Sequence, residues 1–494
     1  MPSGHRTFSN VQLSALDPSR FTPAPLHAKA EDADPFMVHL LNRTTFGYRE
    51  EELAAASALG AEAWLERQLQ GSALDDGGLD AMLAAALPTL GMTYRELFAT
   101  QQRNDAGEPE ANPAGELIAA TLLRQLYSPR QLHEVMVEFW TNHFNVFLLD
   151  GPVRVLKTVD DRDHIRPYAL GRFRDLLHAN AASPAMLYYL DNYSNTREGP
   201  NENYARELLE LHTLGVDGGY GEHDVKEIAR CFTGWGLNPR HPDVFVFDPV
   251  AHDWGEKYVL ETVIPANRGI EDGRMVLDLL ADHPSTARFL ARKLCRRFIA
   301  DEPPESAVDK VARRYTETDG DIPAMLRTLF LSDEFRTSEG EKFKRPAEFV
   351  GSLIRRLHLE FSGDFIEPLF RRLSALGQVP FLAVPPTGYA DEQDAWLSTS
   401  SLLERWNLGS ALAYRSGRRS ASPVALDLPG LAGRPATHAE LVDSLIERIL
   451  HRPIPDPDRE TLIQLARSSG PPAADQTIRT ALAGVLALPA FQQR

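Results

Sequence analysis

Apolar residues recur at helical spacing along most of the chain that follows residue 35. Phe36 and Leu40 belong to the first such stretch, and the spacing of three and four residues persists between Gly115 and Leu149. The same pattern continues in the segments 167–190, 201–214, 224–232, 270–281, 285–299, 305–316 and 322–335. The region after Phe343 is also helical but is more often broken by glycine and proline. The pattern therefore predicts a mainly α fold, an irregular array of many helices.

Two short segments depart from this helical pattern. Val244–Phe247 and Tyr258–Ile264 are rich in β-branched and aromatic residues, which favour strands. A loop with Asp253, Trp254 and Gly255 lies between them. We therefore expect a small β-hairpin insertion near residues 244–264.

The chain has 494 residues, which is long enough for more than one domain. Residues 1–34 are polar and contain several prolines, which indicates an extended or disordered arm. Residues 35–340 carry the strongest patterns without an obvious linker, and we expect them to form a main helical domain that holds the candidate site. Residues 341–494 would form a C-terminal helical region.

Acidic residues outnumber basic residues by 69 to 52, which gives a formal charge of −17. Because a nucleic-acid-binding surface is basic, this balance argues against nucleic acid as the main partner. A local basic pocket for an anionic ligand is still compatible with it. The sequence motifs of nucleotide-binding loops, zinc proteases and α/β-hydrolases do not occur, so those enzyme classes lose their usual support.

The sequence contains no run of about 18 apolar residues, so a transmembrane segment is not expected. Its first residues lack the apolar stretch of a secretory signal, which predicts a cytoplasmic protein if residue 1 is the true start. Cys231 and Cys295 show neither metal-ligand spacing nor a disulfide framework. One disulfide is an alternative, but we expect two free buried thiols.

The most unusual segment is residues 201–214, which mixes amide, guanidinium, carboxylate and imidazole side chains. Arg206 and Glu210 stand four residues apart, and an ordinary ion pair on a capped helix would explain these two. Glu207 and Glu210 stand three residues apart. When two carboxylates lie close together, repulsion between their charges raises the pKa of one of them, as general acid catalysis requires. We therefore predict catalytic roles for Glu207, Glu210 and Arg206, with Asn203 and His212 as binding residues.

A second candidate segment is residues 130–147, where Trp140 and His143 share one helix face. A histidine in an aromatic stripe is usually a core residue, but the adjacent Asn142 favours a polar site. We predict that His143 is catalytic and that Asn142 binds ligand. His133 lies ten residues earlier, roughly 15 Å away along a helix, so the two histidines cannot bind one metal ion.

Two further segments supply binding candidates. Trp235 is flanked by glycines and is either a platform for a sugar ring or a buried turn residue. His252, Asp253 and Lys257 lie in the loop between the predicted strands, where functional side chains are common, although an ordinary turn also explains them.

Residues 283–298 carry two basic stripes. Arg288, Arg292 and Arg296 form one, and Lys293 with Arg297 forms the other. In an acidic chain the simplest interpretation is pairing with carboxylates of neighbouring helices. The sharper alternative is a clamp for an anionic ligand.

These segments resemble a bacterial family known as domain of unknown function number eighteen hundred. The matching segments are HLLNRTTFG (39–47), LHEVMVEFWTNHFNV (132–146), NENYARELLELHTLGVDGGYGEHDVKEIARCFTGWGL (201–237), AHDWGEK (251–257), HPSTARFLARKLCRRF (283–298), KRPAEFVGSLIR (344–355) and WLSTSSLLERWN (396–407). The resemblance covers nearly everything from about residue 36 onward. It implies a mostly helical fold and, because many members are exported, offers export as the alternative to a cytoplasmic location. It implies no activity, but it groups the matching polar residues, which are Asn142, His143, Asn203, Arg206, Glu207, His212, His252 and Asp253.

Three functions are compatible with these residues. The preferred hypothesis is an enzyme that hydrolyses or cleaves a polar polymer such as a polysaccharide, with Glu207 or Glu210 as acid or base, His143 as partner and Arg206 stabilising negative charge. Its ligand would be anionic or a carbohydrate. The second hypothesis is a non-catalytic helical scaffold or ligand-binding protein. The third is a metal or haem redox protein that uses His143, Arg206 and His252. The sequence identifies no particular metal or cofactor.

Overall fold

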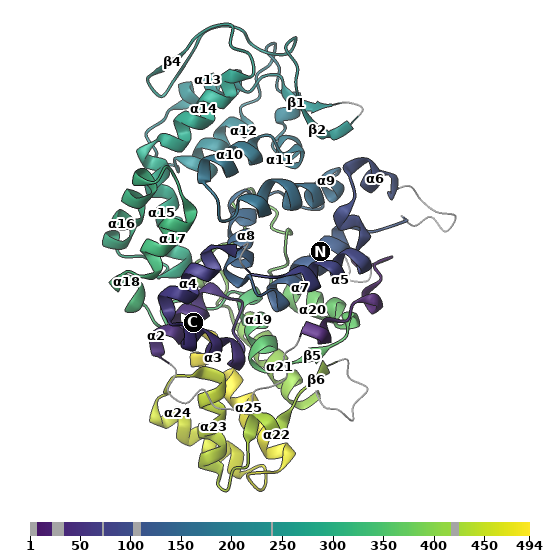
Figure 1. Cartoon of the computed structure of the whole chain (residues 1–494), viewed down its shortest axis with the longest axis vertical. Coiled ribbons are helices and arrows are strands. Elements are labelled where there is room, and N and C mark those ends of the chain that lie inside the picture. The colour runs from purple at the N-terminus through teal and green to yellow at the C-terminus, as the bar shows by residue number, and fades with distance from the viewer. Residues whose placement is uncertain (1–6, 22–33, 72–73, 102–109, 239–240, 416–423) are drawn as a thin grey trace.

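The computed structural model describes residues 7–21, 34–71, 74–101, 110–238, 241–415 and 424–494. The molecule is elongated, with small hairpins at one end and the helices α22–α25 at the other (Figure 1). Helices form most of it, so the predicted mainly α fold is confirmed. Within the described ranges, no helix is both long and apolar enough to cross a membrane.

The first half of the helical array precedes the hairpins. Its helices are α2 (Pro35–Thr44), α3 (Glu50–Leu59), α4 (Ala61–Leu69), α5 (Gly77–Ala86), α6 (Tyr94–Ala99), α7 (Pro113–Tyr127), α8 (Gln131–His143), α9 (Val153–Val159), α10 (Phe173–Ala181), α11 (Pro184–Tyr189), α12 (Asn203–Glu207) and α13 (Glu222–Cys231). Two π-helical segments, η5 (Asp160–Ile165) and η8 (Leu208–Thr213), continue α9 and α12.

The second half follows the hairpins. Its helices are α14 (Glu271–Asp282), α15 (Pro284–Phe298), α16 (Glu305–Glu317), α17 (Ile322–Phe330), α18 (Asp333–Arg336), α19 (Pro346–Arg356), α20 (Ile366–Ala375), α21 (Thr399–Arg415), α22 (Leu428–Ala432), α23 (His438–Leu450), α24 (Asp456–Arg467), α25 (Asp475–Ala487) and α26 (Pro489–Gln492). Short 3₁₀ turns connect many of the helices in both halves.

The strands form separate two-stranded antiparallel sheets. They pair as β1 (Trp235–Asn238) with β2 (His241–Phe247), β3 (Lys257–Val259) with β4 (Thr262–Ile264), and β5 (Glu360–Phe361) with β6 (Val424–Ala425). The predicted β insertion is therefore present, but its two segments do not pair with each other. The second segment folds back on itself through Leu260 and Glu261, whose φ angles of 47° and 63° give the twist that a two-residue hairpin turn needs.

Two apolar cores stabilise the array. One core is built from residues between Met37 and Ala347, and it surrounds α8 and α15. The other is centred on residues 349–491 and includes residues of α5 and α7. The division of the chain at residue 340 stays a prediction. In the predicted N-terminal arm, residues 7–21 pack onto the second core, where Phe8 meets Phe370 edge-on; residues 1–6 and 22–33 lie outside the described residues.

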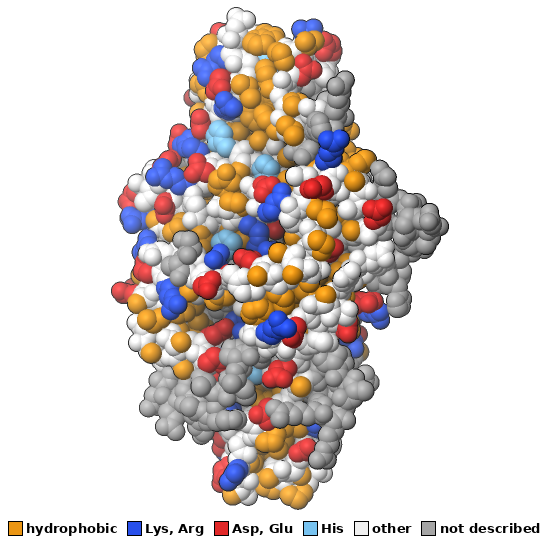
Figure 2. Space-filling view, turned by 45° about the vertical axis from the view of Figure 1, so that its right-hand side comes forward, with side chains coloured by type: hydrophobic (Ala, Val, Ile, Leu, Met, Phe, Trp, Pro, Cys, Tyr) orange, Lys and Arg blue, Asp and Glu red, His pale blue; other side chains and the backbone are white. Residues whose placement is uncertain are grey.

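Charged and hydrophobic side chains both reach the surface of the molecule (Figure 2). Figure 2 shows charged side chains of both signs interspersed along one face, with hydrophobic side chains gathered at the hairpin end. The exposed large apolar residues of that end include Val250, Trp254, Tyr258 and Val263.

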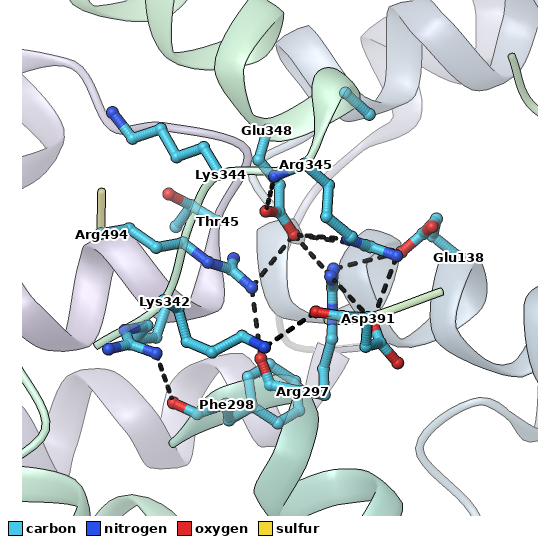
Figure 3. Close-up of polar contacts among 12 residues, drawn as sticks. Thr45, Glu138, Arg297, Phe298, Lys342, Lys344, Arg345, Glu348, Asp391 and Arg494 are labelled. Carbon is cyan, nitrogen blue, oxygen red and sulfur yellow. Dashed lines mark hydrogen bonds and ion pairs between the residues drawn. The ribbon is translucent and has the colours of Figure 1, made fainter. Parts of the chain in front are cut away.

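Two buried arginines share the same carboxylates at the centre of the molecule. Arg297 of α15 donates to Glu348 of α19 at 2.5 Å and to Glu138 of α8 at 3.1 Å. Arg345, which precedes α19, donates to Glu138 at 2.6 Å and to Glu348 at 3.2 Å. Asp391 lies 3.5 Å from Arg297 and 3.2 Å from Arg345. Figure 3 shows these side chains converging, so this central network ties α8, α15 and α19 to the loop that carries Asp391.

A third buried arginine completes the central network. Arg494 lies 3.0 Å from Glu348, and the three guanidinium side chains are at most 2% exposed. Burial alone would raise the pKa of Glu348, but Arg297, Arg494 and Arg345 hold that pKa well below its ordinary value. The carboxylate is therefore ionised, and the network depends on its charge.

Glu348→Gln should lower the free energy of unfolding by about 3–5 kcal/mol, because it leaves buried arginines uncompensated. Glu305→Gln is the matched control, since Glu305 also binds two arginines, Arg288 and Arg292, but on the surface. That control should cost no more than about 1 kcal/mol. Urea denaturation measures both, and similar losses for the two variants would contradict the assigned role of the central network.

Candidate functional site

The last turn of α8 holds a long loop against the helix. Asn142 donates to the carbonyl of Tyr389 at 2.5 Å and accepts from the Tyr389 amide at 2.6 Å. Asn145 donates to the carbonyls of Ala383 and Pro385 at 3.0 and 2.8 Å. Asn142, predicted to bind ligand, therefore satisfies the backbone of this loop, although it also lines the adjacent cavity.

Gly388 allows the loop to approach so closely. Its φ is +72°, and a Cβ at this position would lie 2.3 Å from the carbonyl oxygen of Asn142. Any other residue would both strain the backbone and push the loop away from α8. The loop and the end of α8 thus form one wall of a cavity.

This cavity, of about 330 Å³, is the candidate functional site, and we call it the Lys293 cavity. Its lining residues come from α8, η8, α15 and the loop, and they are Phe139, Asn142, His143, Leu211, Phe289, Lys293, Arg296, Thr387, Gly388, Tyr389, Ala390, Asp391 and Glu392. The volume suits one small ligand or one unit of a larger molecule.

His143 presents a neutral, accepting nitrogen to this cavity. Its Nε2 lies 3.0 Å from the carbonyl oxygen of His212, which can only accept, so Nε2 carries the proton. Its Nδ1 is therefore free to accept from the Lys293 ammonium at 3.0 Å. Burial, together with the positive charge of Lys293, lowers the pKa of His143 well below its ordinary value. The imidazole is thus neutral and fixed in one tautomer.

Lys293 is the cation of the cavity that lacks a carboxylate partner. Burial lowers its pKa to about 8, with Asp391 opposing that shift. Across the described residues, no ion pair joins Lys293 to a carboxylate, because its acidic neighbours are engaged elsewhere: Asp391 with the central network and Glu392 with Arg296 at 2.8 Å. Lys293 therefore offers a half-buried ammonium that an anionic ligand can neutralise.

His212 does not line the cavity, but its backbone carbonyl contacts His143, which does. It lies in the π-helix η8, whose hydrogen bond from the Leu214 amide reaches the carbonyl of Leu209 five residues back. The carbonyl of His212 orients His143, whereas both ring nitrogens of His212 lack a hydrogen-bond partner among the described residues. Burial lowers the pKa of this imidazole to about 3. The ring packs against Phe144 with centroids 5.0 Å apart, as a core residue would.

The predicted catalytic carboxylates lie outside this cavity. Arg206 binds Glu222 at 2.8 Å and Glu202 at 3.3 Å, and it lies 3.9 Å from Glu210. Burial and the nearby Glu210 raise the pKa of Glu207, as the sequence argument expects of paired carboxylates. In the part of the chain that the structure describes, no hydrogen bond or ion pair joins these residues to His143. Asn203 is exposed at the start of α12.

The buried His252 and Lys257 form a separate polar group with the half-buried Asp253. His252 contacts the carbonyl of Thr233 at 2.8 Å and the Asp272 carboxylate at 3.2 Å. Lys257 donates to Asp272 at 2.6 Å, and Asp253 accepts from Arg230 at 2.8 Å. These bonds hold the hairpins to α13 and α14.

Trp235 belongs to the same end of the molecule. Its side chain is 3% exposed and packs so closely over Gly273 that a Cβ there would lie 2.6 Å from the indole ring. The predicted ring platform is therefore not presented to solvent; Trp235 is buried, as the alternative expected, but it begins strand β1 and does not lie in a turn.

The histidines predicted for a metal or haem site offer no free ring nitrogen as a ligand. Both ring nitrogens of His143 and of His252 already have protein partners. Among the residues that the structure describes, no three His, Cys, Asp or Glu side chains are grouped as ligands for a metal ion. Cys231 and Cys295 are buried and free, as expected.

Most of the Lys293 cavity could not be predicted from the sequence. Lys293 appeared only within a basic stripe, and the stripe of Arg288 and Arg292 indeed pairs with a carboxylate of α16. The loop residues Tyr389 and Asp391 carry no local motif, because their place depends on Asn142 and on the distant central network.

His212→Leu should make the free energy of unfolding less dependent on pH. The folded imidazole has a pKa of about 3, below the ordinary value of 6.5, so the unfolded state binds a proton first as pH falls. Stability is therefore lost below about pH 6.5. Removing the imidazole should reduce the loss between pH 7.5 and 5.5 by about 1 kcal/mol. Urea titrations at the two pH values test this, and an identical loss in both proteins would contradict the buried, neutral state of His212.

The comparisons with known proteins agree with the resemblance seen in the sequence. Searches of curated proteins and of solved structures give no match to this chain. The model of the family described as "Protein of unknown function (DUF1800)" matches residues 39–493, which includes every residue of the Lys293 cavity. The chain therefore belongs to the DUF1800 family.

Proposed function

We propose that the Lys293 cavity binds an anionic group of a small polar ligand and that Lys293 and His143 transfer a proton to or from it. The observation that carries this proposal is the ammonium of Lys293, which forms no ion pair with a carboxylate of the described residues and lies 3.0 Å from a neutral His143 nitrogen. An unpaired, half-buried charge is costly, and a bound anion would offset that cost.

The chemistry of the pair supports proton transfer. With a pKa of about 8, Lys293 is mostly protonated at neutral pH, but it loses its proton within about one pH unit above neutrality. It can therefore bind an anion or donate a proton below pH 8, and accept a proton above it. The His212 carbonyl holds the ring of His143, and the hydrogen bond from Lys293 to that ring orients the Lys293 amine. Arg296 also lines the cavity, but it is paired with Glu392, so Lys293 is the cation available to an anion.

Cleavage of a polar polymer such as a polysaccharide stays a prediction for the reaction. The cavity volume of about 330 Å³ favours a single anionic unit, such as an acidic sugar, over a long stretch of polymer. In the described part of the chain, Glu207 and Glu210 form no hydrogen bond or ion pair with His143, so we assign the catalytic roles to Lys293 and His143. A non-catalytic ligand-binding protein is the second candidate, because the same unpaired ammonium would serve binding alone.

Lys293→Met should weaken the binding of glucuronate by at least about tenfold, since a charge-assisted hydrogen bond is lost. Calorimetry on the purified chain, with glucose as the neutral reference, measures this. In the unaltered protein, affinity should fall as pH rises above about 8, because Lys293 loses its proton.

Two variants serve as controls for that titration. Lys226→Met removes the same charge from an exposed position, and Glu207→Gln alters the carboxylate predicted from the sequence. Both should bind glucuronate like the unaltered chain. Equal binding of glucose and glucuronate, or unchanged affinity in Lys293→Met, would contradict the proposal. If His143→Gln abolished turnover of a ligand that it still bound, the catalytic role would be favoured over simple binding.

A further inference from the structure

The side chain of Lys293 has the features of a nucleophile as well as those of an anion-binding group. It is half-buried and lines a cavity of about 330 Å³, so a small molecule can reach its nitrogen. The apolar side chains of Phe139, Leu211 and Phe289 line the same cavity. A lysine in such surroundings loses part of its hydration, and a desolvated lysine readily forms imines with carbonyl compounds. The cavity therefore holds a reactive amine as well as a positive charge.

One hydrogen bond sets the direction of this amine. Lys293 donates to Nδ1 of His143 at 3.0 Å, and that ring nitrogen carries no proton because Nε2 donates to the carbonyl of His212. The neutral amine can donate to Nδ1 just as the ammonium does, since both forms have an N–H. Among the described residues, no carboxylate pairs with the Lys293 nitrogen. The lone pair of the neutral amine is therefore available to attack a bound carbon.

Burial alone does not give a lysine this combination of properties. Burial and the charge of Arg356 lower the pKa of Lys344 well below its ordinary value, but Lys344 is 4% exposed and does not line the Lys293 cavity. Lys257 is also buried, and it binds the carboxylate of Asp272 at 2.6 Å. Lys293 combines a lowered pKa with access from a cavity.

The positive charge of Lys293 favours one class of carbonyl compound. A carboxylate is drawn to the ammonium, as in the proposed function, on which this inference rests. In a 2-oxo acid the carbonyl carbon is bonded directly to the carboxylate carbon. The group that the ammonium attracts therefore brings the electrophilic carbon next to the same nitrogen. An aldehyde without a carboxylate lacks this guidance.

We propose that Lys293 forms an imine with the carbonyl group of a small 2-oxo acid. The amine nitrogen attacks the carbonyl carbon, and a carbon–nitrogen double bond finally replaces the carbon–oxygen double bond. The carbonyl oxygen leaves as one water molecule with two protons that the original ammonium carried. The product is an iminium that keeps the single positive charge, so the carboxylate of the ligand retains its counter-charge.

Reductive trapping with glyoxylate, the smallest 2-oxo acid, tests the proposal on the purified chain. Cyanoborohydride reduces the iminium to a stable carboxymethyl-lysine, and peptide mass spectrometry then gives the labelled fraction at each lysine. At neutral pH, labelling of Lys293 should exceed that of the exposed Lys226 by at least about tenfold, because its lowered pKa leaves more of it as the free amine.

Controls separate a built site from general reactivity. Lys344 should stay unlabelled in the folded chain, because no cavity residue of the Lys293 site gives access to it. In the chain unfolded by urea, Lys293 and Lys226 should react alike. Excess glycolate, which has the carboxylate but no carbonyl group, should slow the labelling of Lys293 alone. With acetaldehyde, which lacks the carboxylate, the preference for Lys293 over Lys226 should fall several-fold.

Equal labelling of Lys293 and Lys226 by glyoxylate, an equal preference with acetaldehyde, or labelling that glycolate does not slow would overturn the proposal. The calorimetry with glucuronate is decided separately. Glucuronate binding without preferential labelling would leave anion binding in place and remove the imine. Preferential labelling without glucuronate binding would keep the imine and contradict an acidic sugar as the ligand.

Discussion

The buried network of Arg297, Arg345 and their shared carboxylates is the constraint on which the rest of the structure depends. Removing such charges from water costs several kcal/mol each, and the cost is offset only if every charge finds partners at good geometry. Glu138 and Glu348 supply those partners from two helices far apart in sequence. The position of α8 relative to α15 and α19 is thereby fixed, together with the loop that carries Asp391.

The same network explains why Lys293 has no carboxylate partner in the described part of the chain. Asp391 is the carboxylate whose charge acts most strongly on the pKa of Lys293. Its ion pairs, however, are with Arg297 and Arg345. Lys293 is left with a neutral histidine as its hydrogen-bond partner. Because the central network takes up the carboxylate of Asp391, the Lys293 ammonium at the edge of the cavity is available to bind an anionic ligand.

The helical fold could be predicted from the sequence because it depends on local spacing of apolar residues, as between Gly115 and Leu149. The pairing of the strands could not be predicted, because the turn at Leu260 and Glu261 lacks the Asn or Gly that usually marks a two-residue hairpin turn. His143 and Asn142 were recognised as unusual because polar residues interrupt an aromatic stripe. Their partners, Lys293 and the backbone of Tyr389, are 150 and 247 residues away, and no local pattern specifies contacts of that range.

The most direct test of the central claim is a nuclear magnetic resonance titration of the Lys293 ammonium, assigned by comparison with Lys293→Met. A half-buried ammonium that bonds to neutral His143, with no carboxylate partner among the described residues, should titrate near pH 8, and its midpoint should rise when glucuronate binds. A midpoint at the ordinary value of 10.5, unchanged by glucuronate, would contradict the account.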